Sequence, residues 1–202
     1  MTPTSYAIDL SHHQDPKSLN WSELPARFQS VYVRATYGCK PDREASKHSF
    51  MARHHGRRVG FYHYLTTNET IPAQLKAFQA QLDLLGCSEN LAPVVDAEEP
   101  GLIASHVSAF YSDLVYTNGA AMIYTSELTW NAYGHPKDWL SGPLWLARYP
   151  KIDPNQPIPL DKMPSLAGVK PVMWQYLVAP IPGFSTQKID QNAVFGVLPS
   201  CL

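Results

Sequence analysis

Two acidic residues near the middle of the chain, Asp96 and Glu98, have the types and spacing that acid–base catalysis by a pair of carboxyl groups would use. They close the apolar run 91–95, which is bounded by breakers and predicts a buried strand. Because side chains alternate along a strand, both carboxyl groups are expected on one face, where crowding raises at least one pKa. A raised acid beside an ionised one is what glycosidic-bond hydrolysis needs. Two exposed acids at a strand end, one of them capping the next helix, would give the same pattern.

The segments around this pair alternate between two kinds. Runs bounded by turn-forming residues predict strands at 5–11, 31–36, 59–65, 91–98, 121–125, 144–149, 172–177 and 188–192. Helical spacing predicts helices at 21–28, 44–55, 71–85, 103–118 and 127–132, with Ile103 on the apolar stripe of the fourth. This alternation predicts an α/β fold, a modified TIM-like barrel of about five βα units followed by three strands with little helix. We expect residues 150–171 to form a long ordered loop and the last two strands a hairpin.

Composition narrows the class of protein. The 202 residues show no linker, so residues 1–202 are expected to form a single barrel domain. A net charge of −1 without a basic run gives no case for nucleic acid, and no apolar stretch is long enough for membrane insertion. The first residues lack the features of a signal peptide. Cys39, Cys87 and Cys201 are odd in number and far apart, which is typical of reduced thiols in a protein made in a cytoplasm.

Polar and aromatic side chains gather at the predicted carboxyl ends of the strands, where barrels of this type place their active sites. Carboxylates, amides and aromatic rings together suit a sugar, whose ring faces stack and whose hydroxyl groups need partners. A strand-end Asp can equally be a helix cap, and a Tyr can be a core residue whose hydroxyl reaches water. The joint occurrence at five or more strand ends favours a site made of Asp9, Ser11, Tyr62, Tyr64, Asp96, Glu98, Tyr124, Trp145, Tyr149, Gln175, Asp190 and Asn192.

Other functions have less support from the residues and their spacing. A zinc amidase could use His12, His13 or His63 with Asp9, but neighbouring histidines on a strand point apart and no His-Glu-x-x-His spacing occurs. We therefore expect no metal and no cofactor. Four strand-end acids argue against a non-catalytic sugar-binding barrel. A chitinase-like glycosidase is the nearest enzymatic alternative, although residues 92–95 lack the further acids expected before Asp96.

Six segments taken in order make a more specific resemblance. These are Ile8–Gln14, Gly60–Tyr64, Pro93–Glu98, Ile123–Thr125, Leu144–Tyr149 and, at the end, Trp174–Tyr176 with Ile189–Asn192. In this order, from about residue 5 to 195, they resemble the glycoside hydrolase family 25 lysozymes. The resemblance implies a barrel of five βα units with three further strands, and N-acetylmuramidase activity on the glycan strands of bacterial peptidoglycan.

The resemblance also implies roles for individual residues. Glu98 corresponds to the general acid, and Asp96 to the group that orients or stabilises the 2-acetamido group during a retaining reaction. Asp9 and Asp190 match the other two acidic positions, and the cleft-lining positions fall on Tyr62, Tyr64, Tyr124, Trp145 and Gln175. Many members have Glu where this chain has Tyr37.

Family members often carry a wall-binding module after the barrel. Here no separate wall-binding domain is expected, and affinity for the wall would come from the cleft. The compact size and the absence of an export signal resemble a phage or prophage endolysin. We therefore expect a monomer that is made in the host cytoplasm and acts on the wall after release.

Overall fold

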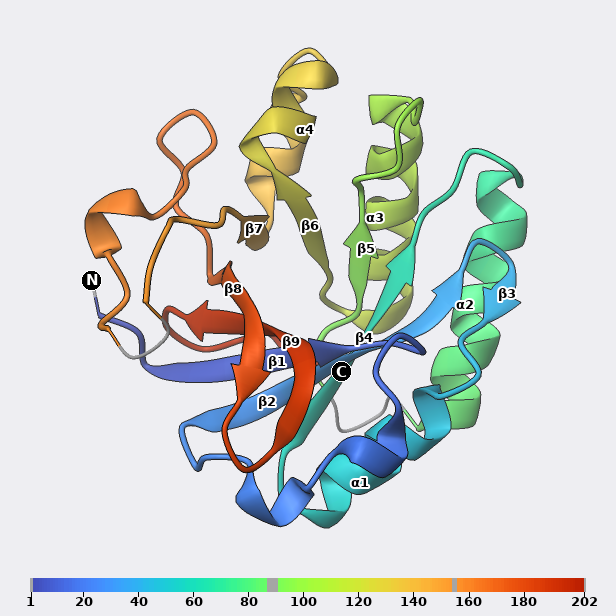
Figure 1. The fold of residues 1–202 in the computed structure, drawn as a ribbon. Helices are drawn as coiled ribbons and strands as arrows, with labels where there is room; N and C mark the ends of the chain where they lie inside the picture. Colours follow the sequence, from blue (N-terminus) through green and yellow to red (C-terminus); the bar gives the residue numbers. More distant parts are fainter. Residues whose placement is uncertain (1, 87–90, 154–155, 202) are drawn as a thin grey trace.

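A computed structural model describes residues 2–86, 91–153 and 156–201 as a closed barrel of eight strands (Figure 1). Its strands, in spatial order, are β1 (Ser5–Leu10), β2 (Phe28–Tyr37), β4 (Arg58–Tyr64), β5 (Val94–Asp96), β6 (Met122–Ser126), β7 (Leu144–Ala147), β8 (Met173–Ile181) and β9 (Ser185–Val194). A short strand, β3 (Lys40–Pro41), adds to the edge of β2 outside the barrel and was not predicted. The predicted α/β barrel is confirmed.

Within the barrel, strand direction changes only at the last strand. Neighbouring barrel strands from β1 to β8 pair in parallel, whereas β9 is antiparallel to both β8 and β1. The predicted hairpin is therefore present, and its second strand closes the barrel by pairing with the first strand of the chain. This pairing sets Asp9 opposite Asp190.

Four α-helices follow the early strands: α1 (Ala45–His54), α2 (Ile71–Leu85), α3 (Ala104–Asn118) and α4 (Glu127–Ala132). The bounds of α2 are those predicted, because Thr70 caps its first turn and Gly86 ends it in the left-handed conformation. Ile103 was wrongly placed on the buried stripe of α3. It is the N-cap residue of that helix and is 56% exposed.

The predicted helix 21–28 is wrong beyond its first turn. Only Trp21–Glu23 is helical, as a 3₁₀ turn, and β2 already begins at Phe28. Pro25 explains the early end, because proline has no N–H to donate and disfavours the helical conformation of the residue before it. Further 3₁₀ turns lie at Pro16–Ser18, Lys137–Ser141 and Leu160–Lys162.

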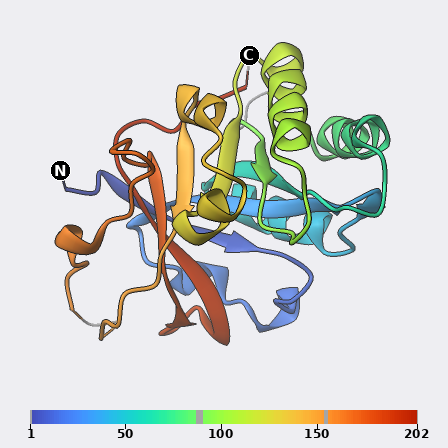
Figure 2. The same cartoon turned by 90° about the horizontal axis from the view of Figure 1, so that it is seen from above.

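Two apolar layers hold the barrel. The larger lies between the strands and the helices, and α1, α2 and α3 cover one side of the barrel (Figures 1 and 2). The smaller fills the lumen, where Tyr32, Tyr124 and Trp145 meet aliphatic side chains. Gly60 lies beside Tyr32 in the strand register, and a Cβ there would come within 2.7 Å of Cδ1 of the Tyr32 ring. The glycine therefore leaves the space that this ring occupies.

On the other side of the barrel, the described residues form no long helix. Instead, the segment after β7 wraps over β8 and β9 (Figure 2) and packs Ile158, Leu160 and Met163 against the layer around Trp174 and Tyr176. Residues 154–155 of the predicted loop lie outside the described residues, as does Cys87. Within the described part of the chain Cys39 forms no disulfide, and Sγ of Cys201 lies 3.6 Å from the carbonyl oxygen of Leu91. Among the described helices, none combines the length and the apolar character needed to cross a bilayer.

Candidate active site

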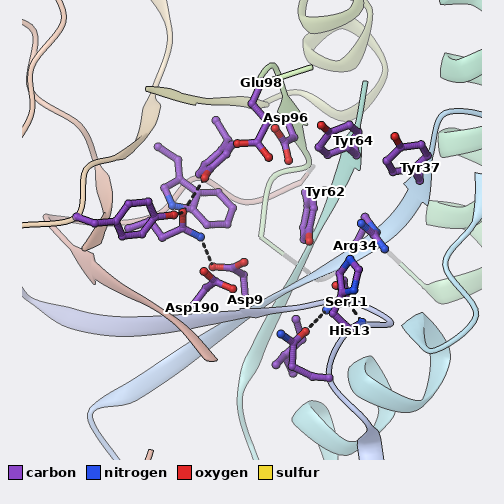
Figure 3. A pocket seen from close by; sticks show the side chains of 16 residues that line it. Asp9, Ser11, His13, Arg34, Tyr37, Tyr62, Tyr64, Asp96, Glu98 and Asp190 are labelled. Atoms are coloured by element: carbon purple, nitrogen blue, oxygen red, sulfur yellow. Dashed lines mark hydrogen bonds between the residues drawn. The ribbon is translucent and has the colours of Figure 1, made fainter. Parts of the chain in front are cut away.

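A pocket of about 390 Å³ opens at the carboxyl ends of the parallel strands (Figure 3). It brings together all of the predicted site residues except Asn192. Its lining consists of Asp9, Leu10, Ser11, His13, Gln14, Arg34, Tyr37, Tyr62, Tyr64, Asp96, Glu98, Tyr124, Trp145, Tyr149, Gln175 and Asp190. Residues from all eight barrel strands or the loops that follow them thus face one cleft.

Asp9 is held by two amides. Its Oδ2 accepts hydrogen bonds from Nδ2 of Asn192 at 2.8 Å and from Nε2 of Gln175 at 3.0 Å. Burial and the negative charge of Asp190 raise the pKa of Asp9 well above its usual value, outweighing the two amides, which lower it. The carboxyl group is therefore fixed in position and biased towards its protonated form.

Asp96 ends β5, and Glu98 lies two residues beyond the strand. Both still face the pocket, because the backbone N–H of Ala97 continues the ladder by donating to the carbonyl of Tyr124 at 3.0 Å. Asp96 is only 5% exposed, and its Oδ1 has no hydrogen-bond partner within the described part of the chain. An unpartnered buried acceptor aimed at a pocket is free to receive a donor from a ligand.

Glu98 differs from Asp96 in its surroundings. Its side chain is exposed in the open cleft, yet the surrounding protein atoms desolvate the carboxyl group in part and raise its pKa. Burial also raises the pKa of Asp96 well above its usual value, and the negative charge of Glu98 adds to the effect. The sequence led us to expect neighbouring charges as the cause for Glu98; desolvation is the cause in the structure.

Asp190 completes the set of four acids. Burial, followed by the negative charge of Glu98, raises the pKa of Asp190 to about 6. All four acids thus have raised pKa values, and the cleft retains protons that the same groups would release in water. Such a site can keep one carboxyl group as a proton donor beside another that is ionised.

A hydrogen-bonded wall connects the tyrosines to Asp9. Gln175 Oε1 accepts from the hydroxyl groups of Tyr124, at 2.6 Å, and Tyr149, while its Nε2 donates to Asp9. Burial raises the pKa values of both tyrosines, so they remain neutral hydrogen-bond donors. The orientation of the Gln175 amide is therefore fixed from both ends.

Asn192, predicted to contact substrate, lies behind this wall instead. Its side chain is fully buried, donates to Asp9 and accepts from Nε1 of Trp145 at 2.8 Å. The side-chain alternation of β9 gives the face on which Asn192 lies but not its depth in the barrel. The structure assigns it to positioning Asp9.

Sequence reasoning missed the charged pair Arg34 and Asp42. Arg34 reaches the pocket from β2, and its Nε donates to Oδ2 of Asp42 at 2.9 Å. Asp42 also accepts from the backbone N–H groups of His12 and Glu44. A charged residue inside the apolar run 31–36 was the available signal, because buried charges are rare unless they are paired.

The histidines do not assemble a metal site. His12 and His13 were expected to point apart, but they lie in a turn after β1, and their ring centroids are 4.1 Å apart. His63 is buried outside the lumen, near Thr36 and Gln74, and burial lowers its pKa to about 3. Across residues 2–86, 91–153 and 156–201, no three His, Cys, Asp or Glu side chains converge as metal ligands would.

Comparison of the sequence with protein-family models identifies the family. The model of glycosyl hydrolases family 25 matches residues 8–181. The chain belongs to this family. It is therefore a glycoside hydrolase of the lysozyme and muramidase family, and its barrel is the fold of a family 25 structure.

Solved structures share the fold at low sequence identity. The bacterial lysozyme from Streptomyces coelicolor is 24% identical with a TM-score of 0.77, covering 97% of this chain and 94% of its own. The muramidase from Trichobolus zukalii is 21% identical with a TM-score of 0.73, covering 96% and 95%. The catalytic domain of the endolysin ply40 from a Listeria monocytogenes bacteriophage is 17% identical with a TM-score of 0.72, covering 95% and 93%. No curated protein sequence matches the chain significantly.

Family 25 folds therefore occur in proteins of bacterial, fungal and phage origin. The expected endolysin origin does not follow from this set, since the fold is common to all three.

Proposed function

We propose that the protein is an N-acetylmuramidase that hydrolyses the β-1,4 bond between N-acetylmuramic acid and N-acetylglucosamine in peptidoglycan. The observation that carries the proposal is the arrangement of Asp96, with its unpartnered Oδ1, beside Glu98 at the open mouth of the cleft. The remaining wall of tyrosines, Gln175 and Trp145 offers stacking faces and hydrogen-bond partners for sugar rings. Membership in the family supports the same substrate, as does the fold shared with a bacterial lysozyme and a fungal muramidase.

The first step uses the acetamido group of the substrate as the nucleophile. Oδ1 of Asp96 accepts the acetamido N–H, which leaves the carbonyl oxygen placed to attack the anomeric carbon. As the glycosidic C–O bond breaks, Glu98 gives its proton to the leaving oxygen, and the ring closes to an oxazolinium ion paired with Asp96. The positive charge that develops at the anomeric carbon is stabilised by the nearby carboxyl groups.

The second step returns the site to its starting state. Glu98, now ionised, takes a proton from a water molecule whose oxygen attacks the anomeric carbon and reopens the oxazolinium ring. Two inversions at one carbon leave the product with retained configuration. Proton NMR of the first product formed would show the β-anomer; an α-anomer would contradict this route.

Replacing the proposed acid tests the assignment. In Glu98→Gln, release of new reducing ends from purified bacterial walls should fall by at least about 100-fold, since general acid catalysis contributes about 10²–10⁴. Glu99→Gln is the matched control, because Glu99 is the adjacent carboxylate but does not line the pocket. Its activity should stay near wild type.

Near-wild-type activity of Glu98→Gln would remove Glu98 from the mechanism. Mass spectrometry of the released muropeptides reports which bond is cut. Products ending in reducing N-acetylglucosamine instead of reducing N-acetylmuramic acid would replace the muramidase proposal by the chitinase-like alternative.

We further propose that the protein acts as a phage or prophage endolysin, a monomer that is made in a host cytoplasm and reaches the wall after release. The same fold occurs in the catalytic domain of the endolysin ply40, so it is compatible with this use. The binding partner is then the glycan strand itself, gripped by the cleft.

A further inference from the structure

The cleft has a second end that the proposed mechanism does not use. Figure 3 shows Arg34, Tyr37 and His13 gathered on one side of the pocket, with Tyr62 between them and the Asp9–Asp190 pair. Among the described residues that line the pocket, Arg34 is the only one with a permanent positive charge. The other charged lining residues are the four acids, so charge is distributed unequally along the cleft.

The guanidinium group of Arg34 is held in place from several directions. Its Nε donates to Asp42, one Nη nitrogen contacts Nδ1 of His12, and its carbon lies 5.7 Å from the centroid of the Tyr37 ring. The Tyr37 ring in turn stacks on Tyr64, with centroids 4.7 Å apart and planes 8° apart. The guanidinium group is therefore pre-organised, and little side-chain entropy remains to be lost on binding.

One edge of this guanidinium group is open to a ligand. Its second terminal nitrogen, Nη1, makes no hydrogen bond within the described part of the chain, although the side chain as a whole is only 8% exposed. Asp42 is fully buried and lies behind the group, where two backbone N–H groups also hold it. The ion pair thus anchors the cation from behind and leaves its front edge directed at the cleft.

We propose that this end of the cleft binds a carboxylate carried by the glycan, with Arg34 donating the hydrogen bonds and Tyr37 fixing its orientation. The inference rests on the proposed function and specifies which substituent of the glycan the site recognises. Those of the four acids that are ionised repel an anionic substrate, and a fixed cation on the other side of Tyr62 from Asp9 and Asp190 lowers that repulsion locally. A neutral polymer such as chitin would gain nothing from it.

Muramic acid offers the carboxylate from two sources. Its 3-O-lactyl carboxyl is free when the peptide stem has been removed, and is an amide when the stem is present; the stem then carries carboxylates of its own. The experiment uses four substrates: stem-free glycan strands with free lactyl carboxylates, the same strands converted to the methylamide, strands with intact stems, and stem-bearing strands whose carboxylates are amidated.

For wild-type protein, kcat/KM should be about tenfold higher on the carboxylate form of at least one pair than on its neutral form, which is the size of one charge-assisted hydrogen bond. The pair that shows the preference identifies the source. In Arg34→Gln the ratio should fall to about one. Because Arg34 also lowers the pKa of Asp96, this variant will lose some activity on every substrate, and only the ratio reports recognition.

A second variant keeps the proposal testable if Arg34→Gln does not fold. Tyr37 is 40% exposed, and Tyr37→Glu places a carboxylate beside Arg34 that competes with the substrate. Its ratio should also fall to about one. Tyr116→Glu is the matched control, because Tyr116 is 91% exposed on α3 and should keep the wild-type ratio.

The outcomes separate the two proposals. Equal wild-type activity on both members of each pair overturns the carboxylate site while leaving muramidase activity intact. A preference that survives in a folded Arg34 variant or in Tyr37→Glu also overturns it. If wild-type protein releases no reducing ends from any of the four substrates, the proposed function itself fails.

Discussion

Ionising a single carboxyl group in the cleft costs the folded protein free energy. Asp190 is partly buried, and with its usual pKa of about 3.8 raised to about 6 the folded protein binds its proton more tightly than the unfolded chain does. Between these two pH values the folded state carries more protons, so stability falls as pH rises. Above pH 6 the group is ionised in both states and the full penalty remains. Catalytic groups are commonly held at such a cost.

Replacing this carboxyl group should therefore raise the stability of the protein and lower its catalytic activity. We expect Asp190→Asn to raise the free energy of unfolding at pH 7 on the order of 1–3 kcal/mol, from a pKa shift of about 2. At pH 3.5, below both pKa values, most of this difference should be gone. Urea denaturation at a series of pH values measures it.

The control for this experiment is Asp161→Asn, at a carboxyl group whose side chain is 73% exposed. Its difference from wild type should show no comparable trend with pH. A folded Asp190→Asn that is no more stable than wild type at pH 7 would mean that the ionised carboxylate is not strained in the cleft.

Sequence could identify some residues of the site and not others for a physical reason. Asp96 and Glu98 stand out because two acids end an apolar run, and spacing alone carries that signal. Arg34 gives a similar signal within its own strand, but its partner Asp42 lies eight residues away and is joined to it only by the fold. For Asn192, periodicity gives the face of the strand, whereas depth in the lumen depends on the barrel's tilt and register.

At the scale of elements, local signals decided which predictions were right. Helices α2 and α4 have the predicted bounds, because a capping side chain begins each one: Thr70 for α2 and Ser126 for α4. The hairpin was predictable from its short connection. The pairing of β9 with β1 was not, since these strands are joined only by closure of the barrel and no local pattern records it.

A substitution in the lumen can test how closely β4 packs against β2. Gly60→Ala on β4 would press a methyl group against the ring of Tyr32 on β2, where both residues are enclosed by the barrel. We expect a loss of about 1–3 kcal/mol in the free energy of unfolding, typical of overpacking. Urea denaturation measures it.

A double-mutant cycle shows whether the ring is the cause. Tyr32→Leu removes the atoms that the new methyl group would meet, so Gly60→Ala should cost less in that background than in wild type. Equal costs in both backgrounds would assign the effect to backbone conformation and not to contact with Tyr32.

Across the whole molecule, the two ends of the chain close one structure. β1 pairs with β2 on one side and β9 on the other, and the last described residues reach the start of β5, where the N–H of Ala92 donates to the carbonyl of Pro199 at 2.8 Å. Asp9 and Asp190 face each other across this closure. The site therefore exists only while the barrel is closed, and the first and last strands cannot separate without destroying it.

Unfolding should accordingly be a single cooperative transition that different probes report at the same urea concentration. Ile8→Ala on β1, at a fully buried side chain, should lower the free energy of unfolding by about 2–5 kcal/mol. Far-UV circular dichroism, tryptophan fluorescence and wall-lytic activity should shift together along the urea axis, as two-state unfolding requires. Ile103→Ala is the control: the same substitution at a side chain that is 56% exposed should change stability by less than about 0.5 kcal/mol. Loss of activity in Ile8→Ala at a urea concentration where circular dichroism is unchanged would show instead that β1 and β9 part while the other strands stay folded.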